Sequence, residues 1–221
     1  MNDRLRLRVK VTWLICLTGL IGSTGCGIGL NRGALPPQHY VLGGASSQAD
    51  ATPSGDLAEL SIGLRRPQIA SYLDAPFIVV RQGPNQIGFS ELHRWGEDLG
   101  GGISRAVAGD LSERAFFRTV DVAPWAPSER YDYLVQIHLL RFEGLTSEEG
   151  EPLEGEAHLL ATWEVLRQED GSVLTRGTTD YREGSWRVGD YAGLVTLLDA
   201  GLGVLSDDLV AAIRGLTRSG P

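Results

Sequence analysis

The two cysteines, Cys16 and Cys26, carry the most reactive side chains of this 221-residue chain. A thiol can act as a nucleophile, a metal ligand, a disulfide partner or a site of modification. Cys26 follows an apolar run at residues 11–21 and small residues at 22–25, and four of the first ten residues are basic. This order is typical of a secretory signal peptide with its cleavage site. We therefore predict a signal peptide over residues 1–25 and Cys26 as the first residue of the mature chain.

The residues around Cys26 resemble a bacterial lipobox, in which the cysteine thiol is acylated after export. Ser23 stands where the lipobox usually has Leu, and an ordinary signal peptide with an incidental cysteine is the alternative. The run at 11–21 is too short to cross about 30 Å of hydrocarbon. Fatty acyl chains such as palmitate would therefore attach the chain to the membrane. By resemblance to known sorting rules, Gly27 in place of Asp favours the outer membrane.

The composition of the mature chain limits its chemistry. Residues 26–221 carry 16 basic and 27 acidic residues, a net charge of −11. Such a chain should be repelled by nucleic acid and by anionic membrane surfaces. Cys16 leaves with the signal peptide and Cys26 would carry lipid, so we expect no disulfide within the chain, no thiol nucleophile and no thiolate metal site.

No catalytic or cofactor motif stands out elsewhere. The sequence has no GxSxG, P-loop, HExxH, CxxC or dinucleotide fingerprint. His138 and His158 could meet across two strands, and a solvent-side pair is favoured over a metal site. The acidic stretch at 148–154 favours a solvated loop over a calcium site, because its spacing departs from the EF-hand loop. Residues 100–102, three glycines, give only a weak case for a phosphate cradle. We predict no enzyme activity, cofactor or metal.

The elements of the N-terminal half are predicted from local patterns. Residues 27–39 indicate a flexible tether and residues 43–56 a loop, with strands at 40–42 and 57–64. Residues 77–81 and 86–89 flank a turn-rich tetrapeptide, which predicts a hairpin.

Ser90 is a suitable cap for a following helix, and apolar residues then recur at three- and four-residue steps. These residues are Leu92, Trp95, Leu99, Ile103, Ala106, Val107 and Leu111. We predict a helix here with Trp95 buried on its apolar face. Residues 100–102 would kink the helix, split it or allow close approach of another backbone, and these alternatives stay open.

The second half of the chain changes to a period of two. Alternating apolar residues at 133–139 and 157–165, followed by 172–183, predict three sequential strands, which favours an antiparallel meander. Trp125, Trp163 and Trp186 are interpreted as core or rim aromatics. Asp190 can cap a C-terminal helix with one leucine-rich stripe. The predicted fold is α+β, a mostly antiparallel sheet with two amphipathic helices packed on one face.

Several motifs, in order along the chain, resemble the ABC-type transport auxiliary lipoproteins. Residues 67–81 are similar to the family's P-x-YLD-x-P-x-[IV]-V-x-R segment, and residues 91–99 to its E-x-x-RW-x-E-x-L helix. Shorter matches are Tyr40-Val41-Leu42-Gly43, Asp132-Tyr133-Leu134 and Ala161-Thr162-Trp163. Within the first motif, Asp74 is expected to bond nearby backbone amides or to pair with Arg81 or Arg94.

The resemblance implies an outer-membrane lipoprotein that faces the periplasm, with residues 40–216 as the family domain after a lipidated tether at 26–39. Its partners would be an MCE-domain protein and inner-membrane transporter subunits that move phospholipid or another hydrophobic molecule between membranes. ATP hydrolysis would belong to a separate subunit. The number of copies in the assembly stays open, a homo-oligomer included. The alternative is a structural or assembly lipoprotein of an outer-membrane machine with no role in lipid passage. Cys26 is the one site residue predicted.

Overall fold

The structure is a computed structural model that describes residues 35–43, 55–146 and 154–219. The predicted signal peptide and Cys26 lie outside these residues, as do most of the predicted tether and residues 148–153 of the acidic stretch. The elements below belong to one unit, Pro36–Pro221.

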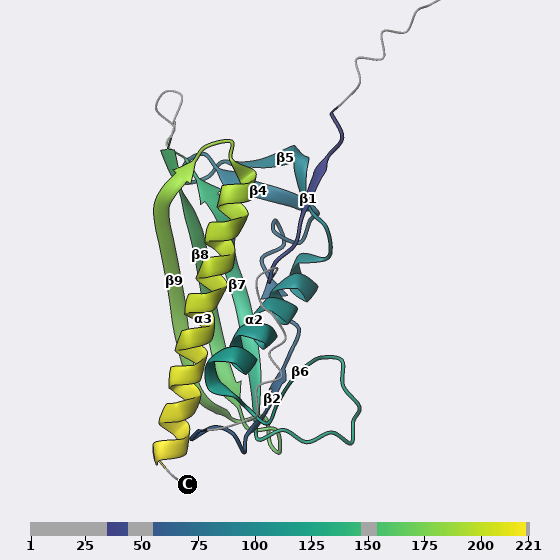
Figure 1. Cartoon of the computed structure of the whole chain (residues 1–221), viewed down its shortest axis with the longest axis vertical. Coiled ribbons are helices and arrows are strands. Elements are labelled where there is room, and N and C mark those ends of the chain that lie inside the picture. Colours follow the sequence, from purple (N-terminus) through teal and green to yellow (C-terminus); the bar gives the residue numbers. More distant parts are fainter. Residues whose placement is uncertain (1–34, 44–54, 147–153, 220–221) are drawn as a thin grey trace, which may run out of the picture. The chain divides into compact units, whose positions relative to one another are not determined.

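A three-stranded antiparallel meander forms the longest part of the sheet (Figure 1). Its strands are β7 (Tyr133–Leu145), β8 (Glu154–Leu166) and β9 (Val173–Arg187). β8 pairs with β7 on one side and with β9 on the other, so that Trp163 lies opposite both Ile137 and Gly177. The period-two pattern therefore predicted this part of the fold correctly.

The other edge of β7 is shared by three short parallel strands from the N-terminal half. In order along β7 these are β2 (Ser61–Leu64), β3 (Gln68–Ile69) and β4 (Phe77–Arg81). β4 continues as an antiparallel hairpin into β5 (Ile87–Trp95), which confirms the predicted hairpin. The sheet is completed by β1 (Gln38–Tyr40), parallel to β5, and β6 (Thr119–Val122), parallel to β2. The parallel pairings were not predicted.

Two predicted strand boundaries are wrong. β1 begins at Gln38, inside the predicted tether, and the predicted strand at 57–64 is a strand only over Ser61–Leu64. Leu57 is buried beside a turn, where Leu60 N–H donates to Leu57 C=O at 3.0 Å. An apolar residue can thus enter the core from a turn as well as from a strand.

The helix predicted from Ser90 begins nine residues later, as α2 (Leu99–Ala115). Residues up to Trp95 belong to β5, where Trp95 N–H donates to Pro76 C=O at 2.9 Å. Ser90 Oγ accepts from His93 N–H at 3.1 Å within an irregular stretch of β5, so its capping bond serves a local turn. The apolar spacing misled because Leu92, Trp95 and Leu99 fall on two different elements. Trp95 is buried as predicted, on a strand rather than a helix.

The three glycines at 100–102 open α2 and do not interrupt it. Asp98 is the N-cap, and its Oδ2 accepts from Gly101 N–H at 2.7 Å. A Cβ on Gly100 would lie 3.2 Å from Ile69 Cδ1, so this glycine allows the first turn to lie close to β3. None of the three alternatives left open for these residues is confirmed, because the helix begins at Leu99 without a break and the atoms that crowd the glycines belong to side chains, not to another backbone.

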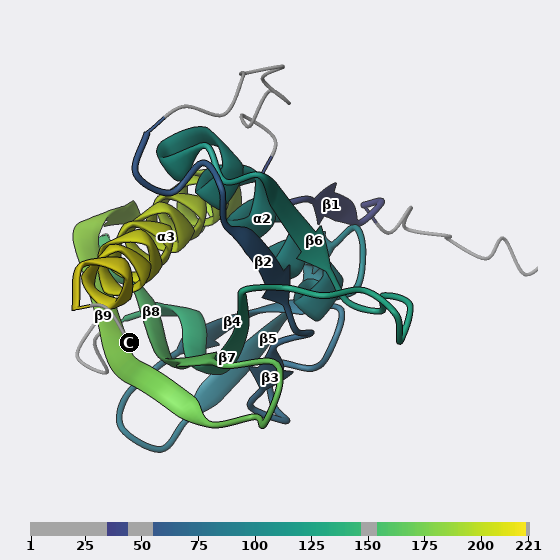
Figure 2. The same ribbon diagram turned by 90° about the horizontal axis from the view of Figure 1, so that it is seen from below.

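The second helix, α3 (Tyr191–Ser219), contacts β8 and β9, while α2 contacts α3 and β6 (Figure 2). Asp190 Oδ1 accepts from Gly193 N–H at 2.9 Å, which confirms the predicted cap. The side chains of its leucine-rich stripe are buried: Leu194, Leu198, Leu202, Leu205, Leu209 and Ile213. The structure is consistent with the predicted α+β class.

A chain of polar contacts connects the meander to α3. Trp163 is buried on β8, and its Nε1–H donates to Thr179 Oγ1 on β9 at 3.3 Å. Thr179 Oγ1 in turn donates to Asp208 Oδ2 on α3 at 2.6 Å. The indole ring lies over Gly177, where a Cβ would approach ring atoms closer than 3 Å. The ring therefore depends on a glycine in the neighbouring strand.

Candidate functional site

The structure does not test the lipidation site, because Cys26 lies outside the described residues. In the part of the chain that is described, no helix is long and apolar enough to cross a membrane. No group of three or more His, Cys, Asp or Glu in that part could hold a metal ion. Two other groups of polar residues are candidates for a role in function.

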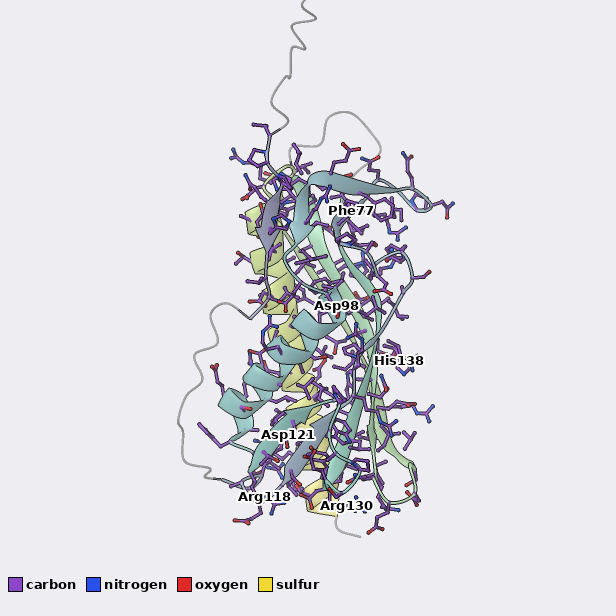
Figure 3. The ribbon with its side chains drawn as sticks, turned by 90° about the vertical axis from the view of Figure 1, so that its right-hand side faces the viewer. Phe77, Asp98, Arg118, Asp121, Arg130 and His138 are labelled. Atoms are coloured by element: carbon purple, nitrogen blue, oxygen red, sulfur yellow. The ribbon has the colours of Figure 1, made fainter. Side chains whose placement is uncertain are left out.

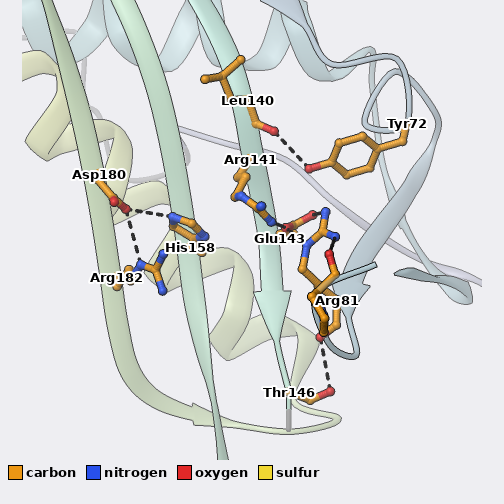
Figure 4. Close-up of polar contacts among 10 residues, drawn as sticks. Tyr72, Arg81, Leu140, Arg141, Glu143, Thr146, His158, Asp180 and Arg182 are labelled. Carbon is orange, nitrogen blue, oxygen red and sulfur yellow. Dashed lines mark hydrogen bonds and ion pairs between the residues drawn. The ribbon is translucent and has the colours of Figure 1, made fainter. Parts of the chain in front are cut away.

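The first group surrounds Glu143, whose side chain is fully buried on β7 (Figure 4). Arg81 of β4 donates to its carboxylate from Nε at 2.6 Å and from Nη2 at 3.3 Å. Arg141 Nη1 donates to Glu143 Oε1 at 2.9 Å. Tyr72 OH donates to Leu140 C=O at 3.1 Å, which places this ring beside the same stretch of β7. We call Tyr72, Arg81, Arg141 and Glu143 the Glu143 cluster.

Burial and charge shift the pKa values in this cluster. Burial, with the Glu143 carboxylate nearby, raises the pKa of Tyr72 to about 12. The hydrogen bond to Glu143 raises the pKa of Arg81 above its already high ordinary value. Tyr72 therefore stays neutral and Arg81 charged at any physiological pH. Two guanidinium groups donate hydrogen bonds to the one buried carboxylate, and a buried charge needs such oppositely charged partners.

His158 and Asp180 lie on the strands next to this cluster (Figure 4). His158 is buried, and its Nε2 lies 2.8 Å from Asp180 Oδ1, which Arg182 Nε approaches to 3.5 Å. Burial lowers the pKa of His158, and the hydrogen bond from His158 lowers the pKa of Asp180. A neutral imidazole that donates from Nε2 fits both shifts. Nδ1 then has no hydrogen-bond partner among the described residues.

The predicted meeting of His138 and His158 is wrong. His138 lies opposite Thr162, while His158 lies opposite Glu143 and Arg182. The alternation placed both histidines on the more polar side of the sheet, but it could not show that Tyr72 and β4 lie beside this end of β7. For this reason a histidine expected to face solvent is buried.

The segment at 67–81 contributes Tyr72 and Arg81 to the Glu143 cluster, a role that was not predicted from the sequence. Asp74 is exposed and forms no hydrogen bond or ion pair with any described residue, so its predicted partners are wrong. Arg81 binds Glu143, and Arg94 donates to Glu91 C=O at 3.2 Å. Nothing in the spacing of the motif pointed to Glu143, which lies 62 residues beyond Arg81.

The geometry of the Glu143 cluster suits a structural clamp. It connects β4 and the segment before it to the meander by charged hydrogen bonds at one end of β7. Its carboxylate and the neighbouring imidazole are buried, and their polar contacts are with charged side chains of the protein. The cluster therefore stabilises the junction between the two halves of the sheet.

The second group lines a groove of about 410 Å³ between α2 and α3. It contains Asp110, Glu113 and Arg114 of α2 and Asp199 of α3, which we call the helix groove. Burial raises the pKa of Asp110, and the negative charges of Asp199 and Glu113 add to this effect. Arg114 Nη1 donates to Asp207 Oδ1 at 2.7 Å, outside the groove lining. Three carboxylates thus face one groove that a single arginine lines.

Comparison with protein families decides where the chain belongs. Residues 40–210 match the family described as ABC-type transport auxiliary lipoprotein component. The chain belongs to this family. The match covers every described helix and strand except the first residues of β1 and the end of α3. No curated protein matches the chain by sequence.

Solved structures share the fold of this auxiliary lipoprotein. The protein XCC0632 from Xanthomonas campestris is 19% identical with a TM-score of 0.60, over 79% of this chain and 90% of that one. An uncharacterized protein is 14% identical with a TM-score of 0.59, over 80% and 99%. A weaker match, with a TM-score of 0.41 and 18% identity over 70% and 94%, is the PelC dodecamer from Paraburkholderia phytofirmans. At these identities the first two similarities establish the fold alone.

Proposed function

We propose that the chain is a non-enzymatic component of an intermembrane lipid transport system, anchored in the outer membrane through acyl chains on Cys26. From there it docks to an MCE-domain protein that spans the periplasm and belongs to a transporter with inner-membrane subunits. The observation that carries this proposal is the family match over residues 40–210, behind a sequence that resembles a lipobox.

The anchor is tested first. Intact-mass analysis of the chain from a membrane fraction should show a mature N-terminus at Cys26 with fatty acyl groups attached. Cys26→Ser should abolish this mass and release or mislocalise the chain, because its acidic domain has little attraction for anionic lipid. An unmodified Cys26 in the membrane fraction would contradict the anchor.

We assign the docking of the MCE-domain partner to the helix groove. Its three carboxylates, Asp110, Glu113 and Asp199, give this side of the two helices a negative charge. The mature chain as a whole has a net charge of −11, so a basic surface on the partner would be attracted from a distance. Charge complementarity of this kind accelerates association and fixes orientation.

The test is recovery of partners from native membranes at two salt concentrations. An MCE-domain protein should be recovered in 0.1 M salt and lost in 1 M salt, where the Debye length falls from about 10 Å to about 3 Å. Glu113→Gln with Asp199→Asn should lower recovery at low salt. The control is Glu169→Gln, an exposed carboxylate in the β8–β9 turn, and Glu113→Gln alone, which removes the same single charge, is compared with it.

Three outcomes separate the alternatives. Equal recovery with the groove variant would place the docking surface elsewhere on the domain. Equal recovery of the MCE-domain protein at both salt concentrations would contradict the electrostatic argument. If no MCE-domain protein is recovered at either salt from correctly localised lipoprotein, the assembly lipoprotein without a role in lipid passage becomes the better proposal.

A further inference from the structure

The β4–β5 hairpin carries two of the large apolar side chains that are exposed on the described sheet, and Leu140 of β7 is another. Phe89 and Leu92 on β5 are 47% and 40% exposed. Phe89 forms an edge-to-face pair with Phe77 of β4, with ring centroids 6.1 Å apart. We call Phe77, Phe89 and Leu92 the hairpin patch.

The pairing of β5 with β4 is irregular at this patch. Phe89 lies opposite Val79 and Arg94 lies opposite Phe77, so β5 has more residues than β4 between the two pairs. The extra residues include Leu92, and the Ser90 Oγ bond to His93 N–H closes them into a turn. Leu92 is therefore held outward by local backbone geometry.

A cation lies at the margin of the patch. The guanidinium carbon of Arg94 lies 5.1 Å from the centre of the Phe77 ring, and its Nε donates to Glu91 C=O. An arginine stem on an aromatic face can keep its charged group at the level of water and phosphate while the ring faces hydrocarbon. Phenylalanine and leucine beside arginine are the residue types that favour insertion into a membrane interface.

The place of the hairpin in the fold indicates what it would contact. β1 begins at Gln38, which pairs with His93, the neighbour of Leu92. Cys26 precedes Gln38 by twelve residues, a length that spans at most about 40 Å when fully extended. The hairpin also lies at the end of β7 that pairs with β4, away from the end that pairs with β2. Figure 3 shows Phe77 near one end of the domain and Arg118, Asp121 and Arg130 near the other.

We propose that the hairpin patch inserts into the interface of the bilayer that holds the acyl anchor. This inference rests on the proposed lipidation of Cys26. The acidic domain has no electrostatic attraction to anionic lipid. The acyl anchor therefore supplies the high local concentration that two or three apolar side chains need in order to insert. Insertion would orient the domain, with β4 and β5 against the membrane and the β2 and β6 end away from it.

The experiment uses the acylated mature chain in vesicles of phosphatidylethanolamine and phosphatidylcholine. With Cys26 acylated, Phe89→Cys or Leu92→Cys provides a single free thiol for an environment-sensitive fluorophore. The matched control is Val173→Cys, which is 38% exposed at the start of β9 and belongs to the β2 end of the sheet. Because each of these side chains is partly covered, the melting temperature of every variant is measured, and a cooperative transition close to that of the parent chain shows that the domain is folded.

The expected result is a blue shift of emission at positions 89 and 92, with loss of intensity when the vesicles contain nitroxide-labelled lipid. Position 173 should keep the emission of a fluorophore in water. Water-like emission at all three positions would overturn the proposal. So would shielding of 89 and 92 from an aqueous quencher without quenching by nitroxide lipid, because a protein would then cover the patch.

Flotation of the vesicles separates this inference from the proposed anchor. If the chain floats with the vesicles and positions 89 and 92 remain in water, the acyl chains hold the protein on the bilayer and the membrane contact of the hairpin is wrong. If the parent chain does not float, the anchor is wrong and the hairpin proposal fails with it.

Discussion

Substitution of Gly177 by alanine should destabilise the domain although it adds only one methyl group. A Cβ at this position of β9 would lie 2.6 Å from Cη2 and 2.7 Å from Cε2 of Trp163, and closer still to Cζ2. The indole ring cannot turn aside freely, because it is buried and its Nε1–H is bonded to Thr179.

The cost follows from these contacts. Overpacking of a well-packed core costs about 1–3 kcal/mol, and a displaced indole loses a hydrogen bond worth about 0.5–1.5 kcal/mol. Alanine recovers about 0.5–1 kcal/mol through the lower flexibility of the unfolded chain. The net loss should be about 2 kcal/mol, or about 4–8 °C in melting temperature for a domain of this size.

Urea denaturation and thermal melting measure this difference, with Gly184→Ala as the matched control on the same strand. A Cβ at Gly184 meets no atom within 4 Å, so this variant should be unchanged or more stable. The double variant with Trp163→Leu should lose less stability than the sum of the two single variants, because the clash is gone. Equal stability of Gly177→Ala and Gly184→Ala would refute the close packing of Trp163 on β9.

Three further predictions concern the core and the polar clusters. Trp95→Ala should lower the free energy of unfolding by about 3–5 kcal/mol, because the ring is buried at the end of β5; a melting temperature within a degree or two of the parent would place it at the surface. Glu143→Ala should cost about 3 kcal/mol in denaturant titration, at the lower end for a broken buried pair because Arg141 can be partly hydrated; an unchanged midpoint would argue against the clamp. Burial lowers the pKa of His158 in the folded chain. As the pH falls through about 6.5, the unfolded chain therefore binds a proton at this histidine before the folded chain does. The free energy of unfolding should decrease from pH 7.5 to pH 5.5 for this reason. His158→Gln should make the free energy of unfolding depend less on pH. The same pH dependence in the parent and the variant would contradict a neutral, buried His158.

Much of the fold could be predicted from local patterns in the sequence. Alternation predicted β7 and β8 because one side of each strand faces the core, and this depends on adjacent residues alone. A short turn followed by residues 172–183 predicted β9. Asp190 identified the start of α3 because a capping bond is formed within one turn of helix. The hypothesis that Cys26 is lipidated likewise depends only on residues that are adjacent in the sequence.

Local patterns gave a wrong prediction at the boundary between β5 and α2. Ser90 has the side chain of a helix cap, but its bond closes a turn inside β5, and Asp98 caps the helix instead. The distinction depends on the pairing of Trp95 with Pro76 and of Gly96 with Tyr40, which are distant in sequence.

Tertiary structure alone decided the polar clusters. The irregular step in β7 between Leu139 and Arg141 sets the register that places Glu143 opposite His158. The parallel pairing of β4 with β7 lies beside the hydrogen bond from Arg81 to Glu143. The sequence by itself determined the strands of the meander, the hairpin between β4 and β5, and the start of α3. Which strands become neighbours, and therefore which charges are buried together, depends on contacts between residues far apart in the chain, whose pairing no local pattern encodes.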